Sequence, residues 1–229
     1  MLNHFSQAKA SADAVEAAKP PDGMFGALVR GSLGFAAVSV AGFAVWAFAG
    51  KWLGTHIGEL GVYFACAITF IVFSGMALHP LVRGPRSLVR FYKIFIPAFG
   101  AYAVAWSAAW FAWRFGLGEW LGSLAGSIVL AVMIGRGLGN FRSVVKVSIV
   151  MFALHSAGYF FGGRLMRWIA SSTIGGLRGG HFSALAKLCW GALYGLGVGA
   201  GLGYAFFTFQ NPPADAANTP STNDAPSTP

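Results

Sequence analysis

Long apolar stretches separated by short polar ones fill the chain between residues 31 and 209. Most approach the roughly 20 residues that a helix needs to cross about 30 Å of hydrocarbon at about 1.5 Å per residue. Membrane-spanning β-strands are shorter and alternate apolar with polar residues, which these continuous runs do not. The pattern predicts transmembrane helices over residues 31–50, 60–78, 91–113, 120–134, 144–161 and 182–209.

Two of these runs have ends that the pattern leaves open. The fourth is the shortest, and extending it to residues 118–138 restores the length without placing a charge deeper than Glu119 or Arg136. The fifth can be extended to Ile169. In that case Arg164 and Arg167 lie at the end of the helix, and their long side chains extend to the membrane interface. A re-entrant segment over residues 171–180 is the alternative for the stretch that follows.

We therefore predict an all-α membrane protein with six transmembrane helices, arranged as three helical hairpins. Residues 1–29 form a polar segment, and residues 30–209 form the transmembrane domain. Residues 210–229 contain Pro, Ala, Thr, Ser, Asn and Asp and no large apolar side chain. Such a tail buries too little surface to offset its ordering entropy, so we expect it to be disordered.

Composition supports a lipid environment. Of the 229 residues, 56% are hydrophobic and 10% charged, whereas soluble domains carry about 25% charged residues. The net charge of +9 is spread between apolar runs and accompanies no RNA- or DNA-binding motif, so nucleic acid is not an expected partner. The expected partner is the lipid bilayer.

The basic residues favour one orientation. With the N-terminus inside, ten of the 16 Lys and Arg residues lie in inner segments, which predicts cytoplasmic termini. We expect a bacterial inner membrane, since no organelle-targeting segment is evident, and anionic lipid headgroups as partners of the basic cytoplasmic loops. The ten inner residues are Lys9, Lys19, Arg30, Arg83, Arg86, Arg90, Lys93, Arg136, Arg142 and Lys146.

A weak internal repeat accompanies the hairpins. Each odd-numbered helix has a basic residue at its start, a glycine inside it and a tryptophan near its outer end. Evenly spaced hairpins with ordinary interface residues are the alternative explanation, because Gly, Trp and Arg occupy such places in many membrane proteins. The landmarks are Arg30, Arg86 and Arg142, then Gly42, Gly100 and Gly158, then Trp52, Trp110 and Trp168.

Two rows of glycines recur at every fourth residue. Residues four apart lie on one helix face, where glycines let another backbone approach closely. We expect packing within the chain, with a homo-oligomer or other membrane-protein contact, or a pore lining, as alternatives. One row is Gly191, Gly195, Gly199 and Gly203, and the other is Gly118, Gly122 and Gly126.

His155 and Ser156 lie near the middle of the fifth run. An ionisable residue at membrane depth is a candidate functional site, because burying a charge there is costly. The alternative is a neutral imidazole bonded to a neighbouring helix. A haem site would need a second His at matching depth, and none is evident.

Glu59 and Glu119 are the acidic residues nearest the membrane, each after a glycine at the start of an even-numbered helix. A carboxylate there is stabilised by unpaired N–H groups and the helix dipole, and a substrate or ion contact is the alternative. Lys51 and Arg114 lie at the same outer side and are candidate partners.

No pattern in the chain indicates chemistry. It contains no phosphate loop, GxSxG or HExxH sequence and no paired carboxylates. Cys66 and Cys189 lie in apolar runs without metal-ligand spacing. We expect no enzyme activity, no metal and no cofactor. The leading hypothesis is a packing or accessory component of a membrane assembly, and the alternative is a small-solute channel or facilitator.

Overall fold

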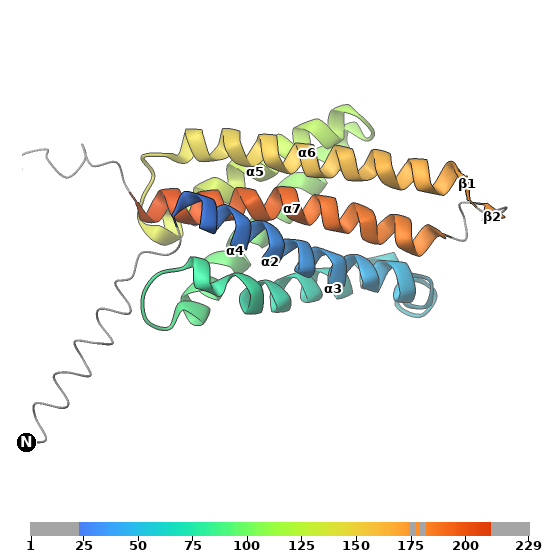
Figure 1. Cartoon of the computed structure of the whole chain (residues 1–229), viewed down its shortest axis with the longest axis horizontal. Helices are drawn as coiled ribbons and strands as arrows, with labels where there is room; N and C mark the ends of the chain where they lie inside the picture. Colours follow the sequence, from blue (N-terminus) through green and yellow to red (C-terminus); the bar gives the residue numbers. More distant parts are fainter. Residues whose placement is uncertain (1–22, 175–176, 179–181, 212–229) are drawn as a thin grey trace, which may run out of the picture.

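The structure, a computed structural model, describes residues 23–174, 177–178 and 182–211. Helices make up nearly all of them (Figure 1). The elements are α2 (Met24–Ala44), the π-helical η1 (Val45–Ala49), α3 (Gly50–Leu78), the 3-10 helix η2 (His79–Leu81), α4 (Ser87–Trp113), α5 (Leu117–Leu138), α6 (Val144–Ser171), β1 (Thr173–Ile174), β2 (Leu177–Arg178) and α7 (Ser183–Gln210).

Five helical segments of the described chain are long and apolar enough to cross a membrane. Four are α4, α5, α6 and α7, and the fifth is the whole stretch Met24–Leu81. A straight helix of its 58 residues would be about 87 Å long, far more than a bilayer core requires. The protein is therefore helical and membrane-compatible, and the six transmembrane helices remain a prediction.

The long stretch reverses direction at Gly58. This residue has φ 76° and ψ 173°, a conformation open to glycine but not to residues with a Cβ atom. Beyond it, α3 runs back along α2, so that Gly42 faces the ring of Phe70 and Gly34 faces Leu78 (Figure 1). The sequence pattern missed this continuity because the polar residues between the first two runs remain helical.

Several helix ends differ from the predicted ones. Helix α2 begins at Met24, ahead of the predicted start, so Arg30 lies inside the helix. Helix α5 matches the extended version of the fourth run, and α6 continues to Ser171, which places Arg164 and Arg167 in helix. The rest of the predicted polar segment, residues 1–22, and residues 212–229 of the predicted tail lie outside the described residues.

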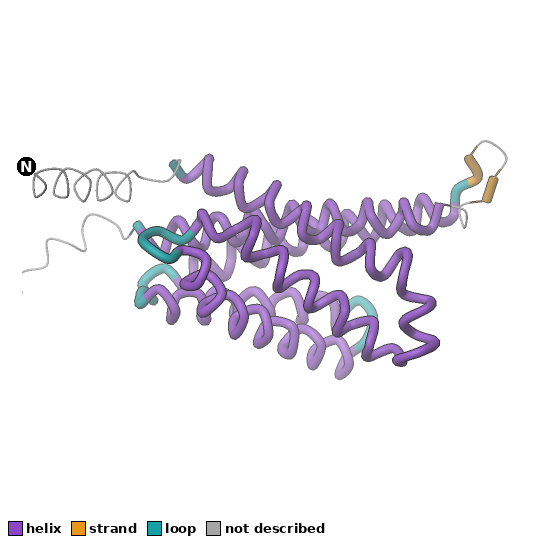
Figure 2. The backbone as a smooth tube through the Cα atoms, turned by 90° about the horizontal axis from the view of Figure 1, so that it is seen from below, coloured by secondary structure: helices purple, strands orange, loops and turns teal. Residues whose placement is uncertain are grey.

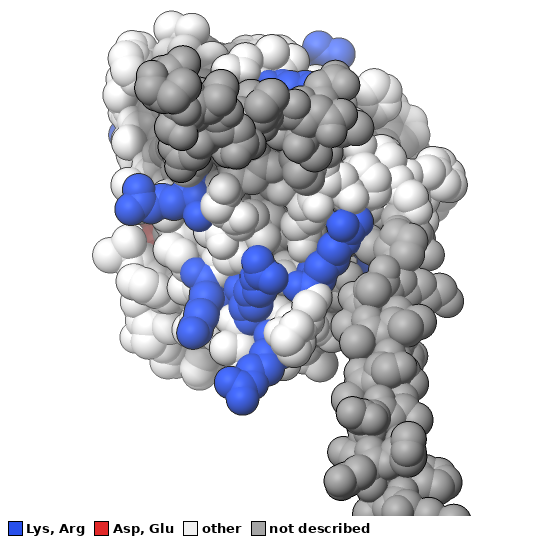
Figure 3. Space-filling view, turned by 90° about the vertical axis from the view of Figure 1, so that its left-hand side faces the viewer, with Lys and Arg blue, Asp and Glu red and all other residues white. Residues whose placement is uncertain are grey.

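The two ends of the bundle differ in character. Residues 23 and 211 lie at the same end as the connections 79–86 and 139–143 (Figure 1), and we call this the basic end. Lys and Arg side chains gather on that face (Figure 3). Gly58, Gly116 and the β1–β2 pair mark the opposite end. The two strands lie beyond the ends of the helices (Figure 2), which favours a loop over a re-entrant segment for their part of residues 171–180.

Helix α7 lies between α2 and α6 and touches both through glycines. On the α2 side, a Cβ atom added at Gly195 would lie 2.6 Å from the Cα atom of Ala36, and Gly199 faces the backbone of Gly31. Gly191 faces the ring of Phe43, and Gly203 faces the backbone of residues 27 and 28. On the α6 side, Gly197 lies against Gly158, so the two seams bring backbones into direct contact.

The second glycine row has a similar place on α5. Gly118 faces the backbone of α4 at residues 109 and 110, Gly122 lies against Trp106, and Gly126 lies under the ring of Tyr102. Both glycine rows therefore face other helices of the same chain. Within the described residues, neither row is therefore exposed to contact a second protein.

The glycine landmarks of the expected repeat have different surroundings. Gly42 meets a phenylalanine ring, Gly158 meets the backbone of α7, and Gly100 has no atom within 4 Å of an added Cβ. Trp52 and Trp168 are largely exposed, whereas Trp110 stacks against Trp106. The threefold repeat and the three equivalent hairpins stay predictions.

Aromatic side chains fill the half of the bundle next to the basic end. Phe91, Phe95 and Phe99 follow one another along α4 with ring centroids 4.9 and 5.2 Å apart. Phe206 of α7 packs against Phe91 with its ring tilted, and Phe35 of α2 is fully buried nearby. This packing closes that half of the molecule.

Candidate functional site: an aromatic cleft between α3 and α4

Helices α3 and α4 meet in the half next to the basic end and stand apart in the other half. The Tyr92 hydroxyl of α4 donates a hydrogen bond of 2.7 Å to the Val72 carbonyl of α3. Further along, Phe70 and Phe99 stack with centroids 5.8 Å apart. Beyond this pair a cavity of about 960 Å³ separates the two helices, and we call it the α3–α4 cleft.

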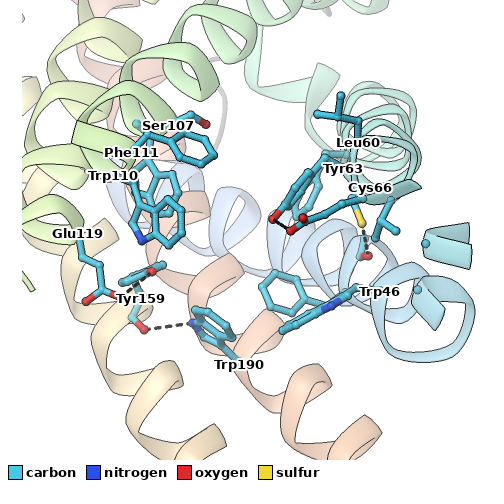
Figure 4. Close-up of a pocket in the computed structure, with 18 of the residues that line it drawn as sticks. Trp46, Leu60, Tyr63, Cys66, Ser107, Trp110, Phe111, Glu119, Tyr159 and Trp190 are labelled. Carbon is cyan, nitrogen blue, oxygen red and sulfur yellow. Dashed lines mark hydrogen bonds between the residues drawn. The ribbon is translucent and has the colours of Figure 1, made fainter. Parts of the chain in front are cut away.

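Aromatic side chains from several helices line the cleft (Figure 4). Its volume is at the upper end of the roughly 300–1,000 Å³ of typical small-molecule sites. Phe70 forms its deepest part, and the 11 helical steps from Glu59 to Phe70 rise about 17 Å, or about half the hydrocarbon thickness. The aromatic lining residues are Phe43, Trp46, Tyr63, Phe70, Trp106, Trp110, Phe111, Phe115, Tyr159 and Trp190.

The cleft opens towards the side of the bundle as well as its end. Tyr63 of α3 and Phe111 of α4 face each other across it and are 59% and 60% exposed (Figure 4). Trp190 and Tyr159 lie at the back, where the Trp190 indole N–H donates to the Tyr159 carbonyl at 3.1 Å. In a bilayer, this geometry gives access from both the lipid and the interface.

Two carboxylates stand on opposite sides of the cleft, each held by a tyrosine. The Tyr63 hydroxyl donates to Glu59 Oε1 at 3.0 Å, one turn along α3. The Tyr159 hydroxyl of α6 donates to Glu119 Oε1 at 3.3 Å (Figure 4). Glu119 lies in the first turn of α5, where the helix dipole stabilises its negative charge.

Lys51 and Arg114 have other contacts than the predicted carboxylate partners. The Arg114 guanidinium lies 5.3 Å from the Trp110 ring centroid and 5.7 Å from that of Phe111. Lys51 is exposed, and its carbonyl accepts a hydrogen bond from Thr55. Sequence reasoning missed Tyr159 because it comes from a helix that is distant in the chain, whereas the spacing of four residues between Glu59 and Tyr63 was a signal that could have found that pair.

His155 lies one turn along α6 from Tyr159, outside the lining of the cleft. Its Nε2 atom is 3.3 Å from the Tyr102 hydroxyl, which is 3.0 Å from the Tyr194 hydroxyl. Its Nδ1 atom is 3.5 Å from the Ser127 hydroxyl. These contacts join α4, α5, α6 and α7 through His155, and a functional role of His155 stays a prediction.

Ser156 is buried next to His155, and its hydroxyl has no hydrogen-bond partner among the described residues. Ser156 does not line the cleft, whereas Ser107 of α4 does. Within the described chain, no group of three His, Cys, Asp or Glu side chains is arranged to hold a metal ion. The cleft thus offers carboxylate and phenol oxygens and the faces of aromatic rings, which suit binding.

Comparison of the chain with family models, with curated proteins and with solved structures finds no match.

Proposed function

We propose that the protein is a non-enzymatic, multi-pass membrane protein that binds a small solute in the α3–α4 cleft and facilitates its movement. The supporting observation is the cleft itself, which is large, aromatic and open at the end opposite the basic one. Sites that bind small molecules are commonly concave and mostly apolar, with a few polar groups.

The cleft is closed towards the basic end. The stacked rings of Phe70 and Phe99, and the fully buried Phe95 and Phe91 behind them, leave no room for a solute. We therefore assign this conformation to a state open on one side. Movement of a solute through the protein would require α3 and α4 to separate at these rings.

A neutral fluorescent probe tests binding in the cleft. N-phenyl-1-naphthylamine accepts energy from tryptophan, and Trp46, Trp106, Trp110 and Trp190 line the site. We expect saturable energy transfer in the purified protein that Ser107→Phe abolishes, because its ring enters the cleft. The matched control is Ala108→Phe, at an exposed neighbouring position of α4. Equal transfer in both variants would contradict the proposal.

We further propose that Met24–Leu81 crosses the membrane twice, which gives six crossings with both termini in the cytoplasm of a bacterial cell. The turn at Gly58 and the antiparallel contact of α2 with α3 support two crossings. The basic end supports the orientation, since cytoplasmic segments are enriched in Lys and Arg, and it suits anionic lipid headgroups. A reporter active only outside the cytoplasm, fused after residue 211, should be inactive, and activity there would reverse the topology.

An accessory role in a larger assembly is the second candidate. The glycine rows no longer support it, because they pack inside the chain. One observation still favours it: outside the cleft, α3 exposes Phe64 and Ile68 by 67% and 60%. Light scattering of the solubilised protein should then show a defined complex, and a single-subunit particle would contradict it.

A further inference from the structure

The charged residues that line the cleft carry one sign. Glu59 and Glu119 are the charged side chains among the described lining residues, and Lys and Arg are absent from that set. Tyrosine hydroxyls donate to both carboxylates, and these bonds satisfy one oxygen of each without neutralising its charge. The charges of the lining itself therefore favour a cation over an anion, and the side chains of Arg114, Lys187 and Arg167 beside it act against that preference.

The aromatic rings add a second preference for positive charge. The face of an indole or phenol ring carries partial negative charge and attracts a cation placed over it. The chain itself uses two rings of the cleft in this way, since Lys187 Nζ lies 4.3 Å from the Trp46 ring centroid and Arg114 lies over Trp110. Neither Lys187 nor Arg114 is among the lining residues. Each therefore shows that a ring of the cleft attracts a cation, and neither occupies the cavity.

The shape of the cleft adds a requirement for apolar surface. Between the carboxylates and Phe70 the lining consists of rings and of aliphatic or small side chains, apart from Ser107, Cys66, the tyrosine hydroxyls and the indole N–H groups. The exposed Tyr63 and Phe111 leave a lateral opening through which a ligand can arrive from the lipid. A small hydrophilic cation would gain little from this surface, whereas an amphiphilic one would bury its apolar part there.

We infer that the α3–α4 cleft binds an amphiphilic organic cation, of the ammonium or phosphonium type, with its charge near Glu59 and Glu119 and its apolar groups among the tryptophan rings. This inference rests on the proposed function, because it names the chemical class of the solute. A permanently charged cation needs no hydrogen-bond donor here, since carboxylate charge and ring faces supply the attraction.

Two ions of nearly the same size and opposite charge test the inference. Tetraphenylphosphonium and tetraphenylborate are each titrated into the full chain in a neutral detergent by isothermal titration calorimetry. Titrations into empty micelles and into Ser107→Phe protein serve as blanks. We expect saturable binding of the phosphonium and at least tenfold weaker binding of the borate.

Charge-neutral variants then locate the source of the preference. Glu59→Gln and Glu119→Gln keep an oxygen that accepts the tyrosine hydrogen bond but remove the negative charge. We expect each to weaken phosphonium binding by about tenfold and to leave borate binding unchanged or improved. Arg114→Gln serves as a control of opposite sign, because removing a nearby cation should tighten phosphonium binding.

The possible outcomes separate the two proposals. If both ions bind equally and Ser107→Phe abolishes both, the cleft is a binding site but its preference for cations is wrong. If the phosphonium binds no better than to the Ser107→Phe blank, the inference also fails, and the neutral naphthylamine probe decides separately whether the cleft binds anything. If the two Gln variants bind the phosphonium like the unaltered protein, the assigned carboxylates are wrong.

Discussion

Helices α7 and α3 both pack on α2, but they do so in opposite ways. Along α7, Gly195 and Gly199 bring backbone against backbone, and no space is left between the helices. Along α3, the contacts with α2 are made by side chains, such as Phe70 against Gly42. Bulky rings hold α3 at a greater distance and leave its other side free to border a cleft. The comparison shows that a glycine facing another backbone lets two helices close, whereas a glycine facing a ring leaves them further apart.

The largest effect is expected from a side chain placed in the closed seam. In Gly199→Leu, the new Cβ atom would collide with the Gly31 carbonyl oxygen, and a helix backbone cannot move aside cheaply. We expect a loss of about 3 kcal/mol or more in the free energy of unfolding. Unfolding in mixed detergent–dodecyl sulfate micelles measures it.

Gly100→Leu is the matched control on α4, since nothing lies within 4 Å of its added Cβ. Its free energy of unfolding should change by about 0.5 kcal/mol or less, with a small gain from helix propensity. Equal losses in the two variants would mean that the seam is not the rigid part of the molecule.

Phe70→Ala should have the next largest effect, because this ring joins the two regions. It contacts Phe35 of α2 and Phe99 of α4 with centroids 5.8 Å away in both cases. Its removal should cost about 2–3 kcal/mol of unfolding free energy and extend the cleft towards the basic end. If the free energy of unfolding of Phe70→Ala equals that of the unaltered protein, Phe70 does not hold α3 and α4 together at the closed end of the cleft.

His155→Leu should have a moderate effect on stability and none on binding. The Tyr102 hydroxyl keeps Tyr194 as a partner, whereas the Ser127 hydroxyl loses its contact, so we expect a loss of about 1–2 kcal/mol. Affinity for the naphthylamine probe should stay within about twofold, since His155 does not line the cleft. A large loss of affinity with unchanged stability would make His155 a functional residue.

The smallest effect on stability is expected from a large side chain placed in the cleft. Ser107→Phe has space available, so its free energy of unfolding should change by about 0.5 kcal/mol or less, like that of Ala108→Phe. The contrast with Gly199→Leu is the direct test of closed against open packing. A loss of several kcal/mol in Ser107→Phe alone would show that the cleft is too small for a ring.

The sequence correctly predicted a helical, membrane-compatible protein, because apolar runs of this length are rare in structures other than transmembrane helices. It also singled out both glycine rows and both carboxylates. It placed a connection between residues 50 and 60, but it did not predict that the chain stays helical on both sides of Gly58, where the reversal lies. It also did not predict that Tyr63 and Tyr159 would hold the carboxylates.

The cleft itself could not be predicted from the sequence. Trp46 and Trp110 each have the character of an ordinary interface residue, and Trp190 lies within an apolar run. Only the separation of α3 from α4 brings them around one cavity, and that separation depends on packing between residues distant in the chain. Periodicity along one helix contains no information about the distance to another.

The accessibility of Cys66 tests the central claim, that an open cleft separates α3 from α4, most directly. Cys66 lines the cleft, whereas Ile68, two residues further on, is exposed on α3 without lining it. A membrane-impermeant cationic methanethiosulfonate is applied to intact cells that carry Cys189→Ser protein, with either Cys66 or Cys66→Ser/Ile68→Cys. A Cys66→Ser/Leu60→Cys variant near the opening confirms that the reagent reaches this end.

The account predicts modification at position 66 but not at 68, and loss of the modification at 66 when Ser107→Phe fills the cleft. If position 66 is as unreactive as position 68 while position 60 reacts, the two helices are not separated by an accessible cleft, and the account is contradicted.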